Sequence, residues 1–462
     1  MKKIALIFPR FRYPSGELPT GLATLAAYIR EQVNDVDLIL IDTSFTPSFD
    51  YIDDRLAGFK PDITGIFMDV LMAPNALKAA GIARRQGSLV ITGGPQATMA
   101  AEDVIQSPDI DAVCLGEGEI TFTEYVETFY GDKDFSRVKG IWYKEAGQVR
   151  KNPPRPLIED IDALPSPAYD LFDMEKYIGY FFQLDTFRPD ARGISLTVSR
   201  GCPYDCTFCQ PTVRKTLGRK VRIRSPQRVV SDIRYLQKAF AMNAFYFADD
   251  LIAVVPGWLE AFSAELINRD IHIAWACNTR ADTLDYATLA KMKAAGLVKI
   301  KIGIESITDR IRNGVYHKKI RYDDIAGLLE NAKKLGVQVF AFFMLGAPTE
   351  TAREVWNTIR FAARADLTEA LFSVTTPLPG SALFDDLVAA GWKPPATVEA
   401  YDYNHVTRPP MSTDEISPAR LAILRKIAYL YFYLHPVRIR FTLRSLTSPA
   451  GIRKLLLKLK RI

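Results

Sequence analysis

The sequence predicts an α/β protein in which a doubly wound parallel sheet is followed by a partial (β/α)6 barrel and a basic helical tail. Three observations support this fold class. Short apolar runs alternate with helical patterns over residues 3–130, six further strand–helix pairs follow from Gly193, and Lys and Arg concentrate in the last tenth of the chain. With 462 residues, 48% of them hydrophobic, the chain is long enough for two or three domains.

The first domain is expected over residues 1–135. Its candidate strands are KIALIFP, VDLILID, DITGIFM, SLVITGG and AVCLGEG, with helical patterns between them. This alternation predicts βαβ units and a Rossmann-like parallel sheet, whose ligands bind beyond the carboxyl ends of the strands. Glycine there lets a ligand approach the backbone, although ordinary strand-to-helix turns would also explain it. The candidate ligand contacts at these ends are Gly93, Gly94, Pro95, Gly116, Glu117 and Gly118.

A connector and a second domain are expected to follow. Residues 136–190 include KNPPRPLIEDIDALPSPAYDLF, which is rich in proline and lacks a helical period, so it predicts an extended connector. Residues 191–390 contain six candidate strands, ISLTVSRG, AFYFADD, IHIAWACNTR, VKIKIGIES, VQVFAFFMLG and ALFSVTTPLPG. Six βα units predict a partial barrel, in which chemistry collects at the carboxyl ends of the strands.

A cysteine motif, SRGCPYDCTFCQ, directly follows the first of these strands. Cys202, Cys206 and Cys209 have the spacing C-x3-C-x2-C, which in an intracellular protein indicates metal or cluster binding. Three thiolates can ligate three irons of a [4Fe–4S] cluster and leave the fourth iron open. An electron-carrier cluster or a structural zinc site would need a fourth protein ligand. Cys114 and Cys277 lie elsewhere in the sequence and no histidine is near the motif, so the open-iron cluster is favoured.

The motif resembles the hallmark of the radical S-adenosylmethionine (SAM) superfamily, CxxxCxΦC, with Phe208 at the aromatic position. The resemblance implies that the open iron chelates SAM and that one electron yields a 5′-deoxyadenosyl radical. It is closest to the cobalamin-binding radical SAM proteins, because ITGGPQAT, CLGEGEITFTEYV, RPLIEDIDALPSPAYDLF, FADDLI, NTRADTL, KIGIESITDRI, FFMLGAPTET and PLPGSALFDDL follow that family's order. The resemblance therefore implies that the first domain binds cobalamin.

The family's motifs also imply roles for single residues. Arg280, Glu305 and Ser306 would lie near the ribose or carboxylate of SAM or near the substrate, with Arg280 and Glu305 as candidate catalytic residues. Met344 and Leu345, in the MLGAP segment, would flank the adenine. Helix capping is the alternative role for the carboxylates. The residues expected to line the methionine end of SAM are Phe247, Ala248, Asp249 and Asp250.

Cobalamin binding is compatible with the histidine content. No histidine precedes His272, so the first domain lacks the D-x-H-x-x-G loop that places an imidazole beneath cobalt in some cobalamin proteins. The resembling family generally lacks that histidine, and a domain retained without its cofactor is the alternative.

The resemblance implies a C-methyltransferase in which one SAM methylates cob(I)alamin and a second supplies the radical that activates the substrate carbon. The first alternative keeps the radical but leads to cyclisation, C–C bond formation or oxidation. The second is a non-catalytic iron–sulfur electron-transfer or binding protein. The expected electron donor is of the flavodoxin or ferredoxin type.

The tail, residues 391–462, carries the positive charge. From Ile416 onward there are 11 Lys and Arg and no Asp or Glu, whereas the preceding chain has 48 basic and 53 acidic residues. The segment LAILRKIAYLYFYL is apolar at helical spacing. It predicts contact of residues 416–462 with anionic headgroups, each basic residue adding about 1 kcal/mol.

This contact would place a cytoplasmic protein at the inner face of the cell membrane, with a hydrophobic lipid, isoprenoid or tetrapyrrole as the expected substrate. The alternative is that the segment packs on the barrel and the charges are solvated. Nucleic acid is disfavoured because the aromatic residues do not interleave with the charges. No apolar run is long enough to predict a spanning helix.

Overall fold

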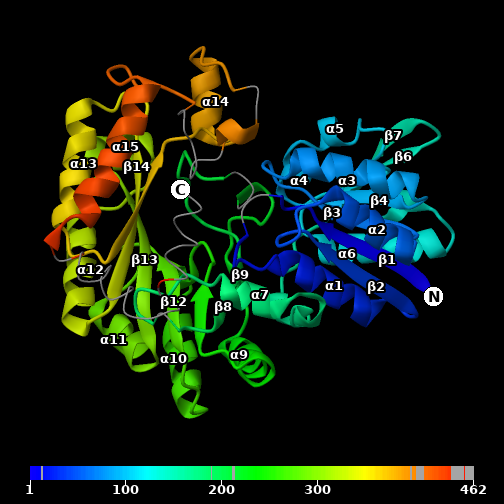
Figure 1. The fold of residues 1–462 in the computed structure, drawn as a ribbon, viewed down its shortest axis with the longest axis horizontal. Coiled ribbons are helices and arrows are strands. Elements are labelled where there is room, and N and C mark those ends of the chain that lie inside the picture. Colours follow the sequence, from blue (N-terminus) through cyan, green and yellow to red (C-terminus); the bar gives the residue numbers. More distant parts are fainter. Residues whose placement is uncertain are drawn as a thin grey trace. The chain divides into compact units, whose positions relative to one another are not determined.

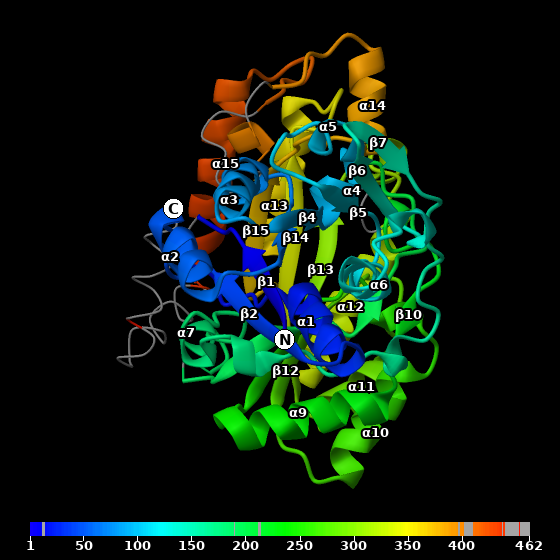
Figure 2. The same ribbon diagram turned by 90° about the vertical axis from the view of Figure 1, so that its right-hand side faces the viewer.

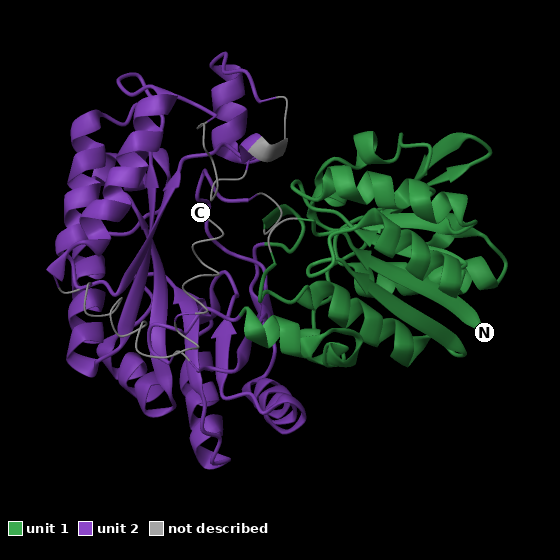
Figure 3. Ribbon diagram, in the orientation of Figure 1, with its two compact units in different colours: residues 1–180, 212–218 green, residues 181–211, 219–462 purple. Residues whose placement is uncertain are grey.

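The computed structural model describes residues 1–11, 14–188, 190–210, 214–395, 398–401 and 410–436, together with Arg438 and Ile452. The chain forms two compact units (Figures 1 and 3). Unit 1 comprises residues 1–180 and 212–218, and unit 2 comprises residues 181–211 and 219–462. Both are α/β units built on parallel strands, which confirms the predicted fold class.

Unit 1 is a seven-stranded sheet with the order β2-β1-β3-β4-β5-β6-β7. The first five strands are parallel, as predicted, and β6 and β7 run antiparallel. The strand order reverses between β1 and β3, and ligands of doubly wound sheets bind at such a switch point. The strand bounds are β1 Lys2–Phe8, β2 Val36–Asp42, β3 Ile63–Phe67, β4 Leu89–Gly93, β5 Ala112–Cys114, β6 Ile141–Glu145 and β7 Gln148–Lys151.

The helices of unit 1 pack in pairs, α1 with α6 and α2 with α3, and so cover the two faces of the sheet. Their apolar sides bury residues such as Ile29, Ile52 and Leu56. The helix bounds are α1 Thr20–Gln32, α2 Phe49–Phe59, α3 Ala73–Arg85, α4 Pro95–Met99, α5 Ala101–Val104, α6 Gly118–Tyr130 and α7 Met174–Gly179.

Strands β6 and β7 fall within the segment expected to be a connector. Strand β6 pairs with β5, with Val113 opposite Trp142, and burial alternates so that Ile141 and Tyr143 are buried. The period-two pattern of this hairpin is short and precedes the proline-rich stretch, which is why sequence reasoning did not predict it. The chain then returns to the sheet at α7, where the Tyr177 hydroxyl donates to Asp42 Oδ2 (2.7 Å).

Unit 2 is a six-stranded parallel sheet with the order β15-β14-β13-β12-β11-β8, a half barrel that confirms the six predicted strands. Figure 2 shows these strands from the side. Their bounds are β8 Gly193–Leu196, β11 Ala244–Phe247, β12 Ala274–Thr279, β13 Leu297–Glu305, β14 Gln338–Leu345 and β15 Glu369–Val374. A two-stranded antiparallel pair, β9 Ser199–Arg200 and β10 Arg222–Ile223, lies outside the sheet.

Side-chain caps start several helices of unit 2. Ser225 accepts a hydrogen bond from the backbone N–H of Arg228, and Thr351 forms a capping box with Glu354. Such caps stabilise a helix by about 1 kcal/mol. The bounds are α9 Pro226–Phe240, α10 Trp258–Asn268, α11 Tyr286–Ala294, α12 Tyr322–Leu335, α13 Ala352–Arg364, α14 Ala382–Ala389 and α15 Pro418–Tyr433.

The inner face of the half barrel is identified by Lys301 on β13. Its ammonium lies 3.9 Å from the ring centre of Tyr246 on β11 and 5.1 Å from that of Phe340 on β14. A β13 side chain reaches β11, two strands away, only on the concave face. Because side chains alternate along a strand, Lys299 and Gly303 share this face with Lys301. The register shifts between Gly303 and Glu305, and the Glu305 carboxylate lies over the inner face of Gly303.

Helix α15 confirms that the tail is helical over residues 418–433. Its buried residues Leu421, Leu424, Ala428 and Phe432 pack against β15 and α13. One face of the helix therefore packs on the half barrel, as the alternative interpretation of the tail expected. Residues 439–451 and 453–462 lie outside the described residues. Among the described helices, none combines the length and apolar character needed to cross a bilayer.

Candidate functional site

The three cysteines lie in one loop beyond β8. The pairing of β9 with β10, with Ser199 opposite Ile223, closes this loop at its base. Cys202 and Cys206 are partly exposed and Cys209 is exposed. The loop thus holds three thiols within reach of solvent at the carboxyl end of the first barrel strand, as the sequence predicts.

Electrostatic effects link the three thiols. The pKa of Cys209 is raised to about 12, mainly by burial and also by the neighbouring Asp250 and the thiols of Cys206 and Cys202, whereas Lys318 lowers it. Burial also raises the pKa of Cys202.

The donor set fits a cluster with an open iron. Three thiols provide three soft ligands, and among the described residues no three His, Cys, Asp or Glu side chains converge to hold a single metal ion. A cubane places each thiolate on a different iron, so its ligands need no such convergence.

Phe208 connects the cysteine loop to the loop that follows β14. Its ring meets Tyr316 edge-to-face at 5.2 Å, and it packs with Met344 against a small cluster that includes Ala347 and Ile311. The structure therefore brings the predicted aromatic residue and the predicted adenine-flanking methionine together.

Arg280 connects the end of β12 to the same loop. Its guanidinium lies 3.7 Å from the ring centre of Tyr204 and forms two hydrogen bonds with Asp282 (2.9 and 2.8 Å). It also donates to the carbonyl oxygens of Lys318 and Lys319. These contacts give Arg280 a positioning role between the cysteine loop and residues 318–319.

Glu305 forms a buried ion pair that sequence reasoning did not predict. Its Oε1 accepts from Lys318 Nζ (2.7 Å), with side-chain exposures of 6% and 11%. The backbone of Glu305 has φ +61°, a conformation that costs energy for a non-glycine residue and is concentrated at functional sites. Gly303 makes room for the pair, because a Cβ there would lie 2.3 Å from Glu305 Oε1. The pair lies beside the cysteine loop, since Lys318 also faces the ring of Phe208.

Asp249 and Asp250 differ in their surroundings. Asp249 Oδ1 accepts from the backbone of Val198 (2.8 Å) and the hydroxyl of Ser199 (2.7 Å), so it fixes the chain that enters the cysteine loop. Burial raises the pKa of Asp249 to about 7, and its Oδ2 has no partner among the described residues. Asp250 is exposed and raises the pKa of Cys202 and Cys209.

Three predicted SAM-contacting side chains are not brought to the cysteine loop. Phe247 packs against Phe262 of α10, Leu345 is fully buried, and Ser306 forms a hydrogen bond with Thr358 of α13. Because strand residues alternate between faces, a contiguous motif cannot direct every side chain to one ligand. Contact of these three residues with SAM would have to use their backbone. Ala248 is partly buried on the opposite face from Phe247.

Glu350 shapes the MLGAP segment and was missed from the sequence. Its Oε2 accepts from the backbone N–H groups of Gly346 (2.7 Å) and Ala347 (3.0 Å). Burial raises the pKa of Glu350 to about 7. The sequence signal that could have identified Glu350 is its position four residues after Gly346, the glycine that follows β14.

The glycines that follow the strands of unit 1 differ in their surroundings. Gly94 has φ +103° and a Cβ there would lie 2.9 Å from the Met68 carbonyl oxygen, so local packing requires this glycine. Gly116 has φ +73° with open space around it, as a ligand contact needs. Glu117 accepts from the backbone of Ile158 (2.7 Å). The other three have ordinary surroundings: Gly93 and Gly118 lie at van der Waals distance from Cys114, and Pro95 begins α4.

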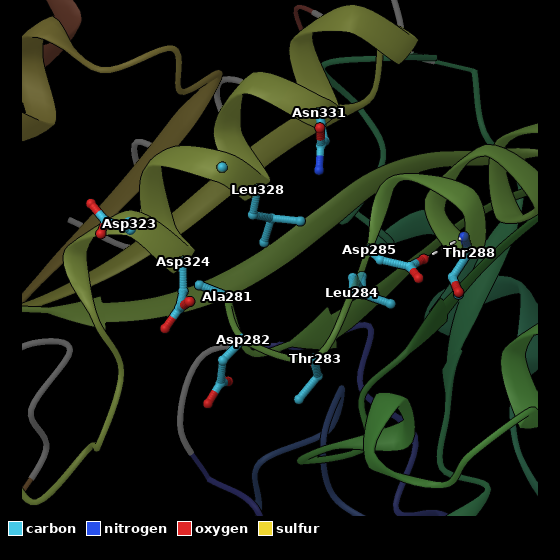
Figure 4. A pocket seen from close by; sticks show the side chains of 11 residues that line it. Ala281, Asp282, Thr283, Leu284, Asp285, Thr288, Asp323, Asp324, Leu328 and Asn331 are labelled. Carbon is cyan, nitrogen blue, oxygen red and sulfur yellow. Dashed lines mark hydrogen bonds between the residues drawn. The ribbon is translucent and has the colours of Figure 1, made fainter.

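A polar cavity of about 440 Å³ adjoins Arg280, between the starts of α11 and α12 (Figure 4). Three of its four carboxylates have partners: Asp282 binds Arg280, Asp285 caps α11 and Asp324 binds Arg321. The cavity is therefore a polar neighbour of the site and does not match an apolar substrate.

The two units of the chain are similar to known protein families. Residues 196–362 match the radical SAM superfamily and residues 14–126 match the B12 binding domain. An uncharacterized methyltransferase of Pyrococcus horikoshii is 31% identical over 432 residues, which cover 90% of this chain and 88% of that protein. The chain belongs to the cobalamin-binding radical SAM family. It is thus a cobalamin-dependent radical SAM enzyme of the methyltransferase type, with a [4Fe–4S] cluster, SAM and cobalamin as its cofactors.

Two further similarities are to a cyclase and to a protein of known structure. An anaerobic magnesium-protoporphyrin IX monomethyl ester cyclase of Rubrivivax gelatinosus is 27% identical over 460 residues, covering 95% of this chain and 79% of the cyclase. The solved structure of the cobalamin-dependent SAM radical enzyme OxsB, with aqua-cobalamin and SAM bound, superposes with a TM-score of 0.66 at 20% identity. It covers 85% of this chain, and this chain spans 56% of OxsB, so that likeness concerns the fold.

Replacing Lys318 by Met is expected to lower SAM cleavage by about tenfold or more, because removing one partner leaves the buried Glu305 carboxylate uncompensated. The measurement is 5′-deoxyadenosine formation by dithionite-reduced enzyme over a range of SAM concentrations. Iron and sulfide contents should stay at wild-type values. The exposed neighbour Lys319, changed to Met, is the matched control. Equal activity of the two variants would contradict a role for the ion pair.

Proposed function

We propose that this enzyme transfers a methyl group to an unactivated carbon of an apolar substrate bound inside the half barrel. When bound, the cluster and SAM supply a 5′-deoxyadenosyl radical, and cobalamin supplies the methyl-transfer chemistry. The observation that supports an apolar substrate is the composition of the inner face beside the cysteine loop.

Beside the charged Lys301 and Glu305, the inner face of β14 and β15 presents an apolar wall that is reachable. Phe340, Phe342 and Met344 on β14 and Leu371 on β15 are partly exposed, whereas the residues between them, such as Phe343, are fully buried. Binding sites of small molecules are lined mostly by hydrophobic and aromatic side chains. Met344 and Phe208 pack against the same buried cluster of Ile311, Tyr316 and Ala347, so this wall extends toward the cysteine loop.

The chain's own residues would place the reactants in this proposal. Cys202, Cys206 and Cys209 hold the cluster, and Glu350 fixes the loop that contacts SAM. The Lys318–Glu305 pair gives a charged boundary between that loop and the apolar wall. The wall excludes water from the radical, which protects it from side reactions.

The experiment is anaerobic incubation of the reconstituted enzyme with methyl-labelled SAM and a lipid extract of the source organism. Label is expected in an apolar product, and its absence from every extracted compound would contradict the proposed substrate class. Phe342→Asp should reduce the labelled product, while Phe384→Asp, on α14, serves as the control for a buried-charge effect elsewhere.

A second candidate reaction is radical cyclisation without methyl transfer, and the similarity to the cyclase of Rubrivivax gelatinosus favours it. The same incubation distinguishes the two reactions, because methylation also forms S-adenosylhomocysteine. Both reactions need an electron, and we propose that a flavodoxin- or ferredoxin-type protein supplies it.

A further inference from the structure

Helix α15 has a second apolar face, which points away from the half barrel. Ile423, Leu430 and Leu434 are 57%, 59% and 66% exposed. Their spacing of seven and four residues places them on one side of the helix, opposite Leu421 and Phe432, which are buried. These three exposed residues are called the outer stripe below.

Exposed apolar side chains are concentrated at this stripe. Fourteen large hydrophobic residues are exposed in the described part of the chain, and five of them lie within residues 423–434. The other two of these five are Tyr431 and Tyr433, which flank the stripe. A contiguous exposed apolar patch marks an interaction surface.

Contacts near both ends of α15 hold the stripe against unit 2. Arg438 is 3% exposed and donates to the carbonyl oxygens of Ala363 (2.7 Å) and Ala365 (2.7 Å) at the end of α13. Near its start, α15 reaches the MLGAP segment, since a Cβ on Gly346 would lie 2.7 Å from Leu421. Figures 1 and 2 show α15 beside α13.

We propose that the outer stripe of α15 inserts into the interface of an anionic lipid membrane and presents unit 2 to a substrate dissolved there. The exposed cations Arg420 and Lys426 flank the stripe, and the chain from Ile416 onward has 11 basic and no acidic residues. An apolar helix face bordered by Lys and Arg lies in the plane of a membrane surface. The inference rests on the proposed function, because it states where an apolar substrate is met.

Charge disfavours the other occupants of the stripe. A second copy of the chain meeting this helix would set Arg420 and Lys426 of one copy near the same cations of the other, and the chain has no acidic residue from Ile416 onward. Like charges repel at such an interface. Three to five side chains are also fewer than the 20–30 residues that each partner typically contributes to a stable protein interface.

The first test is vesicle flotation of the reconstituted enzyme at low salt. The wild type is expected to float with vesicles of phosphatidylcholine and phosphatidylglycerol and to stay behind with phosphatidylcholine alone. Ile423→Glu/Leu430→Glu should lower the bound fraction by about tenfold or more, because the variant lacks two aliphatic side chains that would be buried in the lipid. Ile267→Glu/Val388→Glu, at positions 55% and 41% exposed on α10 and α14, is the charge-matched control. Equal flotation of the two double variants would overturn the proposal.

The second test measures whether the stripe is accessible to a reagent when no lipid is present. A maleimide should label Leu430→Cys as fast as Ile267→Cys, read from the labelled peptides by mass spectrometry, and anionic vesicles should protect only Leu430→Cys. Slow labelling without vesicles would overturn the proposal, because the chain's own tail or a second copy would then occupy the stripe. SAM cleavage without vesicles should be the same in the wild type and in all variants. If the wild type and every variant lacked SAM cleavage, that result would count against the proposed function and not against the membrane proposal.

Discussion

Replacing Cys206 by Ser is expected to abolish SAM cleavage. With two thiols left, the loop cannot hold three irons, and no other described cysteine lies in it. The expected result is loss of the cluster's iron and sulfide and a fall in 5′-deoxyadenosine to the level without enzyme. Anaerobic reconstitution, metal analysis and product chromatography measure these quantities.

Cys114→Ala is the matched control for this variant. Cys114 is a buried thiol on β5 in unit 1 and is not part of the cysteine loop. The control should keep full iron content and SAM cleavage. Retention of a catalytically competent cluster by Cys206→Ser would contradict the assignment of the three ligands.

Replacing Glu369 by Ala is expected to cost about 3–5 kcal/mol of unfolding free energy, because it leaves a buried ammonium uncompensated. Lys299 is 1% exposed on the inner face of β13 and pairs with Glu369 of β15. The ammonium also donates to the Thr186 hydroxyl (2.7 Å) and the Gln183 carbonyl oxygen (3.0 Å), so the pair fastens residues 183–186 to the sheet. Urea unfolding of the metal-free protein, followed by tryptophan fluorescence, measures the change.

Two controls give this prediction a clear outcome. Glu330→Ala breaks an exposed pair with Lys334 and should cost less than about 0.5 kcal/mol. The double variant Lys299→Met/Glu369→Leu should regain most of the lost stability, because apolar side chains of similar volume replace both charges. A double variant no more stable than Glu369→Ala would show that the buried charge is not the cause.

The regular elements could be predicted because they depend on local patterns. The strands of β8 and β11–β15 are apolar runs between helical segments, and the structure confirms each of them. The three cysteines could be predicted as a group because their spacing lies within one loop.

The partners across the site could not be predicted, because they depend on how distant segments fold back. Lys318 reaches Glu305 through the turn at residues 317–319, where His317 and Lys319 adopt positive φ. Tyr204 meets Arg280 only when the cysteine loop returns to β12. Phe247 illustrates the opposite problem, since strand alternation turns its ring toward α10 although it stands within a motif.

The two faces of α15 show why amino-acid composition alone could not decide between the two interpretations of the tail. The sequence offered a membrane helix and a packed helix as alternatives. The structure packs Leu421 and Phe432 against the half barrel and leaves Ile423 and Leu430 exposed. The buried face confirms the packed helix, and the exposed face is the one for which we propose membrane contact.

The ratio of the two SAM-derived products tests the central claim most directly. Reconstituted enzyme with cobalamin, reductant and lipid extract should form S-adenosylhomocysteine and 5′-deoxyadenosine in nearly equal amounts, and both should depend on the extract. Formation of 5′-deoxyadenosine without S-adenosylhomocysteine would contradict methyl transfer and favour cyclisation.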